Sequence, residues 1–264
     1  MQKSLTKCLS LSLEGHISLW RTRRETFVWL VTLIIQTGTV SLWRLAGHVD
    51  TQSKTLSVHR RFERFFQHVR LDEGCVARLL VHIMGLSGKP WHLALDRTNW
   101  KFGRCHINIL MLGVIHEKVC IPLFWVLLDK AGNSNTKERT DLMSKLNEAF
   151  PGQPLASLSG DREFIGETWL HWLESQGIPF VLRLKENMFI WKEGYVPVKL
   201  SAHARHLQKR QTLILKGTWY LGRDPSKATT PIKIAMMRLK TGEMLIVAAS
   251  RIRIKTALPI YRNR

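Results

Sequence analysis

The first part of the chain carries hydrophobic positions at helical spacing. The segment from Phe27 to Ile35 is apolar on all sides, which is typical of a buried helix. Further on, apolar residues recur at intervals of four, three, one and three positions and so share one face of a helix. These residues are Val58, Phe62, Phe65, Phe66 and Val69. Asp72 is suited to cap another helix, which ends at Gly85. Residues 1–86 are therefore predicted to be helical.

The hydrophobic period changes after residue 90. Residues 92–96 alternate, with Leu93 and Leu95 on one face of a strand. The long apolar runs at 106–115 and 120–128 are typical of buried strands. Asn135, followed by Glu138 three positions later, has the spacing of a helix capping box. These patterns predict three strands followed by a helix.

Strands and helices then alternate. A strand at 155–160 ends before Asp161, and a helix at 164–176 and a strand at 179–185 follow. This order predicts an α/β sheet that begins with hairpins, and it does not fit a doubly wound fold. Further short strands are predicted at residues 195–200, 212–216, 218–221, 232–239 and 244–249.

The charge of the chain narrows the class of partner. Its 264 residues include 40 Lys and Arg against 20 Asp and Glu, a net charge of +20, and the 45% of hydrophobic residues exclude global disorder. A polyanion such as DNA, RNA or an anionic membrane is favoured, and an enzyme of acidic metabolites is not. The net charge is +7 over residues 1–90, +1 over 91–185 and +12 over 186–264. A nearly neutral middle between basic flanks fits a cation-holding centre with DNA gripped on either side.

Two features of the sequence, an apolar segment and the cysteines, could indicate a membrane span or a metal site. Thr26 to Trp43 carries no charge, but polar residues 36–39 interrupt it, and a span needs roughly 20 mostly apolar residues. We expect two buried helices joined near Gly38 and no membrane partner. The cysteines, at positions 8, 75, 105 and 120, lack the Cys-x2-Cys spacing of zinc or redox motifs and predict reduced thiols in a cytoplasmic protein.

Asp96 and Asp161 are the candidate catalytic residues. Each follows an apolar strand, where a carboxylate lies at the edge of a sheet and not in its core. Mg²⁺ is commonly held by one or two carboxylates together with phosphate oxygens of the substrate. Two such ions can support phosphodiester chemistry. Aspartates at strand ends also occur in turns and caps, so spacing alone leaves both interpretations open.

Four short motifs carry a resemblance to a known family. They are DRTNW at 96–100, GNSN at 132–135, GDREFIG at 160–166 and RLKEN at 183–187. Together they resemble the DDE transposases of bacterial insertion sequences, which have an RNase H-like core and a β-rich insertion. The resemblance covers residues 87–264. It implies an RNase H-like mixed α/β sheet with an N-terminal helical DNA-binding domain at 1–86, the first part of the catalytic domain at 87–185, the insertion at 186–250 and the start of the final catalytic helix at 251–264.

The resemblance also implies an activity. Asp96 and Asp161 correspond to the first and second metal-binding acids, which hold two Mg²⁺ or Mn²⁺ ions. Tyr261 and Arg264 match the opening of a Tyr-x2-Arg-x3-Glu-x6-Lys signature, whose glutamate would fall four residues after Arg264, where the sequence given stops. We therefore expect cut-and-paste DNA transposition, by cleavage and joining of strands, impaired by the absence of this third acid.

Double-stranded DNA, as element ends and target, is the expected partner. Basic residues on the polar face of the helix near position 60 are candidates for phosphate contacts, as are residues near the expected site of DNA cleavage. An aromatic residue of the insertion can stack on a flipped base. The candidates are Arg60, Arg61, Arg64, Arg183, Lys185, Tyr261 and Arg264 for phosphates and Trp219 or Trp191 for stacking. Solvated charge and ordinary core packing are the competing interpretations. The family works as a dimer, so we expect a homodimer or a mixed oligomer with an intact transposase, associated with the bacterial nucleoid.

Two other hypotheses remain open from the sequence. A non-catalytic DNA-binding regulator would share the basic flanks and would inhibit transposition without needing the third acid. A folding-defective remnant of a decayed element would expose apolar surface around Trp169 and Trp172.

Overall fold

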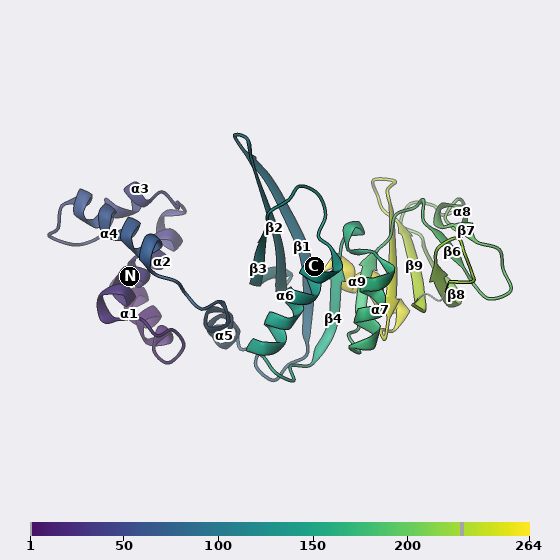
Figure 1. The fold of residues 1–264 in the computed structure, drawn as a ribbon, viewed down its shortest axis with the longest axis horizontal. Coiled ribbons are helices and arrows are strands. Elements are labelled where there is room, and N and C mark those ends of the chain that lie inside the picture. Colours follow the sequence, from purple (N-terminus) through teal and green to yellow (C-terminus); the bar gives the residue numbers. More distant parts are fainter. Residues whose placement is uncertain (1, 228–229) are drawn as a thin grey trace. The chain divides into compact units, whose positions relative to one another are not determined.

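The computed structural model describes residues 2–227 and 230–264, and it describes their side chains except at 2–5 and 102. The chain divides into two compact units, Met1–Ser87 and Gly88–Arg264. Figure 1 shows the first unit as helices and the second as a sheet with helices.

The first unit is helical, as predicted. Its helices are α1 (Gln2–Leu13), α2 (Arg21–Thr37), α3 (Leu42–Ala46), α4 (Thr55–His68) and α5 (Glu73–Ile83). Gly38 ends α2 in the left-handed conformation (φ 64°), which confirms two helices joined at this glycine. Asp72 caps α5 by accepting a hydrogen bond from the Cys75 amide at 2.6 Å.

The core of this unit lies between α2, α3 and α4. Leu30 and Leu33 of α2 pack with Leu45 of α3 and with the buried stripe of α4, which contains Phe62. The predicted α4 face was wrong at Phe66, which is 56% exposed. Phe66 directly follows Phe65, and adjacent helical residues point about 100° apart, so the buried stripe does not include both.

The second unit is a mixed α/β structure. Its strands are β1 (Trp91–Phe102), β2 (Cys105–His116), β3 (Val119–Leu128), β4 (Leu155–Gly160), β5 (Phe180–Arg183), β6 (Phe189–Trp191), β7 (Val198–Lys199), β8 (Thr212–Leu221), β9 (Ile232–Arg238) and β10 (Met244–Ser250). Its helices are α6 (Thr136–Ala149), the 3-10 turn η1 (Arg162–Phe164), α7 (Glu167–Ser175), α8 (Leu200–His203) and α9 (Ile254–Arg262).

The described strands form one sheet in the order β3-β2-β1-β4-β5-β10-β9-β8-β6-β7. The first three strands pair antiparallel, and β1, β4 and β5 are parallel neighbours. From β5 onward the pairing is antiparallel, and β10 joins the remaining strands to the edge of β5. The predicted fold class, a mixed α/β sheet preceded in the sequence by helices, is confirmed.

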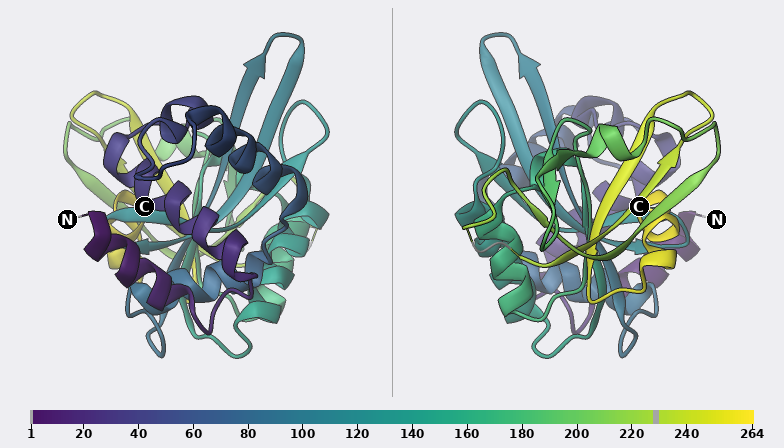
Figure 2. Two further views of the ribbon diagram at one scale, coloured as in Figure 1. Left: turned by 90° about the vertical axis from the view of Figure 1, so that its left-hand side faces the viewer. Right: turned by 90° about the vertical axis from the view of Figure 1, so that its right-hand side faces the viewer.

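Helices cover both faces of this sheet. Figure 2 shows α9 (yellow) on one side and α6 with α7 (teal and green) on the other. Ala257, Leu258 and Tyr261 of α9 pack on a face that includes Val181 of β5 and Val247 of β10. This packing holds the last residues of the chain against β5 and β10.

Several predicted elements were wrong in their bounds. The predicted strand at 195–200 is a turn through Gly194 (φ 78°) followed by the short β7, because Pro197 lacks the amide that a ladder needs. The two strands predicted at 212–216 and 218–221 are one strand, β8, with a register shift between Leu215 and Trp219. The helix predicted from 164 begins at Glu167, after η1.

The capping box at the start of α6 is confirmed. The Asn135 side chain accepts from the Glu138 amide at 2.9 Å, and the Glu138 carboxylate accepts from the Asn135 amide at 2.7 Å. We expect Asn135→Ala to lower the free energy of unfolding by about 1 kcal/mol, because it leaves the Glu138 amide without its acceptor. Urea unfolding measures this, with Asn147→Ala on an exposed position of the same helix as control. Equal losses for both variants would contradict the capping role.

Candidate functional site

Asp96 and Asp161 lie on neighbouring strands, Asp96 within β1 and Asp161 directly after β4. The prediction that Asp96 ends a strand was wrong, because the pairing of β1 with β2 continues to Phe102. Leu95 of β1 lies opposite Gly160 of β4 in a parallel pair, so the next residues, Asp96 and Asp161, are neighbours at the point where β4 ends. Adjacent strands lie about 4.8 Å apart, which places these two residues side by side. Asp96 is exposed, and the side chain of Asp161 is 41% exposed. Both carboxylates are therefore open to solvent.

Three residues from distant parts of the chain surround Asp161. The Tyr261 hydroxyl lies 3.3 Å from Asp161 Oδ1 and can donate to it. Arg183 Nη1 lies 3.8 Å from Oδ1, and Arg264 Nη2 lies 4.0 Å from Oδ2. Burial raises the pKa of Tyr261, so its hydroxyl keeps its proton at neutral pH. The structure thus gathers three of the predicted DNA-contacting residues around the second aspartate.

A further carboxylate, Glu243, binds two of the nearby arginines. It lies between β9 and β10, and its Oε1 accepts from Nη2 of Arg162 and from Nη2 of Arg183. The hydrogen bond from Arg183 is the largest cause that holds the pKa of Glu243 below its usual range. The sequence did not single out Arg162 or Glu243. The position of Arg162 directly after Asp161 could have identified it as a site residue, whereas no sequence feature identified Glu243.

These arginines keep unused donors. Within the described part of the chain, Nε of Arg162, Nε of Arg183 and Nη1 of Arg264 are buried and have no hydrogen-bond partner. Buried donors without partners are costly, and a guanidinium is suited to bind a phosphate through two donors. The cluster of Arg162, Arg183 and Arg264 concentrates positive charge beside Asp161, although these three donor atoms are shielded from solvent.

Arg97 and Glu163 join the two aspartate-bearing segments. Arg97 Nε lies 2.9 and 3.1 Å from the two carboxylate oxygens of Glu163, and the two side chains are only 14% and 18% exposed. Arg97 also donates to Oδ1 of Asn108 at 3.1 Å and to Oδ1 of Asn133 at 3.3 Å. Since Arg97 follows Asp96 and Glu163 lies two residues after Asp161, this ion pair fixes one aspartate segment against the other.

The loop at 132–135 supports the same segments. Arg139 is 4% exposed and donates to Ser134 and to the backbone carbonyl of Glu163 at 3.0 Å. Burial lowers the pKa of Arg139. The amide of Asn108 donates to the carbonyls of Lys130 and Gly132 at 3.0 Å each. This motif therefore acts in the structure as a support for the site.

The carboxylates of Asp96 and Asp161 supply only part of the ligands that a divalent cation needs. Among the residues that the structure describes, no group of three or more His, Cys, Asp or Glu side chains could hold a metal. Two neighbouring carboxylates nevertheless meet the usual protein contribution to Mg²⁺, which takes its other ligands from water and substrate phosphate. Asp96 and Asp161 can thus hold such an ion, while a third protein ligand would have to come from outside this set.

The other predicted DNA contacts have different surroundings. Lys185 is exposed just after β5. Trp219 is half-buried, packs its ring edge-on against His203 at 5.4 Å, and donates to the Lys216 carbonyl at 3.3 Å. Trp191 stacks on Tyr220 at 4.5 Å. These contacts give both tryptophans a packing role within the β-rich region.

Arg60 and Arg64 of α4 are exposed, as a phosphate contact requires. Arg61 differs, because its guanidinium is engaged with α2. It donates to Thr26 Oγ1 and to Glu25 Oε2, each at 2.7 Å, and it covers the Trp29 ring at 4.3 Å. Arg61 therefore ties α4 to α2.

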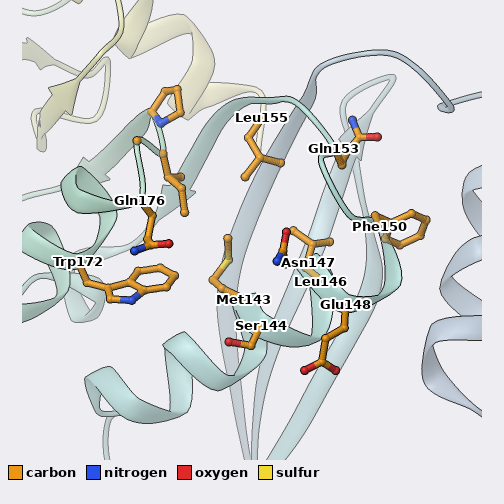
Figure 3. A pocket seen from close by; sticks show the side chains of 13 residues that line it. Met143, Ser144, Leu146, Asn147, Glu148, Phe150, Gln153, Leu155, Trp172 and Gln176 are labelled. Carbon is orange, nitrogen blue, oxygen red and sulfur yellow. The ribbon is translucent and has the colours of Figure 1, made fainter.

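A hollow of about 500 Å³ lies between α6 and α7, away from the aspartates. Figure 3 shows Trp172 and Gln176 facing Met143 and Asn147 across it. Its wall includes Leu155, at the start of β4, whereas Asp161 follows the end of the same strand. The hollow thus belongs to the opposite edge of the sheet.

No helix among the described residues is long and apolar enough to cross a membrane.

Comparisons with known proteins give weak structural likenesses. No protein-family model and no curated protein matches the sequence. Among solved structures, the piggyBac transposase synaptic complex with hairpin DNA matches at 12% identity and a TM-score of 0.42, covering 97% of this chain and 60% of that chain. Endonuclease V from Bacillus subtilis matches at 9% identity and 0.34, covering 74% and 84%. Marinitoga piezophila Argonaute with guide RNA and target DNA matches at 10% and 0.29, covering 78% and 30%. The chain thus spans 60% of the piggyBac chain, and similarity this low carries no argument about function.

Proposed function

We propose that the chain is a DNA-processing protein of the DDE transposase type from a bacterial insertion sequence. The observation that carries this proposal is the emergence of Asp96 and Asp161 side by side from parallel strands. The four sequence motifs support it, because they lie at the aspartates, at the supporting loop and at β5. The net charge of +20 supports a nucleic acid as the partner.

The residues of the site divide the chemistry among them. Asp96 and Asp161 would hold Mg²⁺ or Mn²⁺, which activates a water or a 3′-hydroxyl and stabilises the leaving oxygen in phosphodiester chemistry. Arg162, Arg183 and Arg264 would draw the phosphate backbone to the site through their positive charge beside Asp161. The Arg97–Glu163 pair positions the aspartate segments. With two carboxylates in place, we expect residues 1–264 to bind DNA and to cut it slowly.

Other residues of the chain are candidates for DNA contacts outside this site. Arg60 and Arg64 offer exposed guanidinium groups in the helical unit, and Lys185 offers an exposed cation just after β5. For cleavage and joining at two element ends we propose a homodimer, or a mixed oligomer with an intact transposase, that is associated with the bacterial nucleoid.

Nicking of supercoiled plasmid DNA tests the proposal. We expect slow nicking with Mn²⁺ or Mg²⁺, none with EDTA, and background rates for Asp96→Asn. Nicking that persists unchanged in this variant would exclude the assigned site.

Glu243 competes with DNA for the arginine cluster. We expect Glu243→Gln to raise DNA affinity by about three- to tenfold at neutral pH, because it releases Arg162 and Arg183 for phosphate. Since the pKa of Glu243 is lowered, its ion pairs are complete above the ordinary glutamate pKa and are lost as the pH falls through the lowered value. The gain from the substitution should therefore shrink in acid.

Fluorescence anisotropy with a labelled random-sequence duplex measures this affinity. Glu193→Gln is the matched control, because it removes the same charge from an exposed turn. If both variants raise affinity equally, general charge and not release of the arginines explains the gain.

A second candidate function is a DNA-binding regulator that lowers transposition without cutting. It is favoured by the absence of a third metal-ligating side chain among the described residues beside Asp96 and Asp161. Co-expression with an intact element discriminates the two. DNA binding and reduced transposition without metal-dependent nicking would support the regulator.

A further inference from the structure

The hairpin of β1 and β2 extends past the rest of the sheet. β4 pairs with β1 only as far as Leu95, and β3 pairs with β2 only as far as Asn108. Residues 100–107, which we call the ribbon, therefore pair only with each other. Figure 1 shows the hairpin projecting from the sheet. At about 3.4 Å per residue, its end lies about 20 Å from Asp96.

The ribbon is an exposed structure with an unusual composition. Trp100 is 59% exposed, and its cross-strand neighbour is Ile107. A two-stranded hairpin with no third strand or helix against it is marginally stable in water, so packing does not account for a tryptophan there. Gly103 supplies the positive φ (60°) of the turn, and Arg104 follows it. A large apolar side chain thus lies beside a basic tip.

The charge of the ribbon points to a polyanion. Residues 97–116 contain Arg97, Lys101 and Arg104 and no Asp or Glu. Arg97 is committed to Glu163, but in the described part of the chain no carboxylate lies within ion-pair distance of Lys101 or Arg104. Side chains alternate along a strand, so Trp100 lies on the face that carries Asp96.

We propose that the ribbon enters the major groove of the DNA duplex beside the cut. This proposal rests on the proposed function, because it assumes that a duplex bound at Asp96 and Asp161 continues along the ribbon. A two-stranded β-ribbon fits the major groove, which is about 12 Å wide, and not the narrower minor groove. Lys101 and Arg104 contact phosphates there, and Trp100 contacts the bases or sugars. The end of the ribbon lies about six base pairs from the cut, at 3.4 Å per base pair.

Binding to a random-sequence duplex in EDTA tests the ribbon without cleavage. We expect the double variant Lys101→Ala with Arg104→Ala to lose about tenfold in affinity and to reduce the slope of log K against log salt by about 1.8, because two phosphate contacts are lost. Trp100→Ala should lose about tenfold with little change in slope. Lys118→Ala, at the exposed turn between β2 and β3, is the matched control and should bind as the native chain does.

A second measurement locates the ribbon on the DNA. Cys105 is exposed at the end of the ribbon, so an iron chelate can be attached to it in a background with Cys8, Cys75 and Cys120 replaced by serine. We expect hydroxyl-radical cuts in bound DNA, centred about six base pairs from any Mn²⁺-dependent nick.

The outcomes separate the ribbon from the proposed function. If Asp96→Asn leaves nicking unchanged but the ribbon variants lose affinity, the site assignment fails and the DNA-binding ribbon stands. Native affinity and slope in both ribbon variants overturn the proposal. A change only in oligomeric state, measured by light scattering, also overturns it and assigns the ribbon to a contact with a second copy.

Discussion

Asp161→Asn should reduce metal-dependent nicking of plasmid DNA at least about a hundredfold. The substitution keeps the size of the side chain but removes one of the two charges available to a divalent cation at this sheet edge. It also leaves Arg183 and Arg264 facing a neutral group, so DNA binding in EDTA should be retained or strengthened. Loss of cleavage with retained binding is the result that separates a metal ligand from a binding residue.

Asp129→Asn is the matched control for this variant. Asp129 directly follows β3 and is exposed, as Asp96 is. It should nick DNA at the native rate. Equal loss in both variants would mean that general charge and not the pair at β1 and β4 governs the reaction.

Breaking the Arg97–Glu163 pair should have the largest effect on stability. Arg97→Met leaves the Glu163 carboxylate, 18% exposed, without its arginine partner, and it removes donors to Asn108 and Asn133. We expect the free energy of unfolding of the second unit to fall by about 3 kcal/mol. Nicking should fall as well, because the segments of Asp96 and Asp161 are no longer fixed to each other.

Urea unfolding of the single and double variants measures this coupling. The double variant Arg97→Met with Glu163→Met should recover part of the stability lost by Arg97→Met, because it removes the unpaired carboxylate. Nicking should not recover with it. Additive losses in the double variant would show that the two side chains do not act as a pair.

Much of the local structure could be predicted from the sequence because local patterns determine it. The capping box at Asn135, the left-handed stop at Gly38 and the strand before Asp161 each depend on residues within a few positions. The continuous apolar runs gave β2 to β4 their approximate bounds, whereas the alternation at 92–96 missed the second half of β1, which runs to Phe102. The hydrophobic pattern gave wrong strand bounds where a single turn or bulge redirected the chain, as at Pro197 and in β8.

The order of strands and the surroundings of Asp161 could not be predicted in this way. Periodicity shows which face of a strand is buried but not which distant strand lies beside it, so the pairing of β10 with β5 gave no sequence signal. Glu243 reaches Arg183 across 60 positions and Glu163 reaches Arg97 across 66. The positions of Tyr261 and Arg264 near Asp161 likewise depend on α9 packing on the sheet.

Iron-directed cleavage of the protein backbone tests the central claim, that Asp96 and Asp161 together hold a divalent cation. Fe²⁺ with ascorbate produces hydroxyl radicals at its binding site, and these cut the nearby chain. The account predicts cuts near residues 96 and 161 that Mg²⁺ suppresses and that disappear in Asp96→Asn and Asp161→Asn. Cuts elsewhere, or cuts at these positions that persist in both variants, would contradict it.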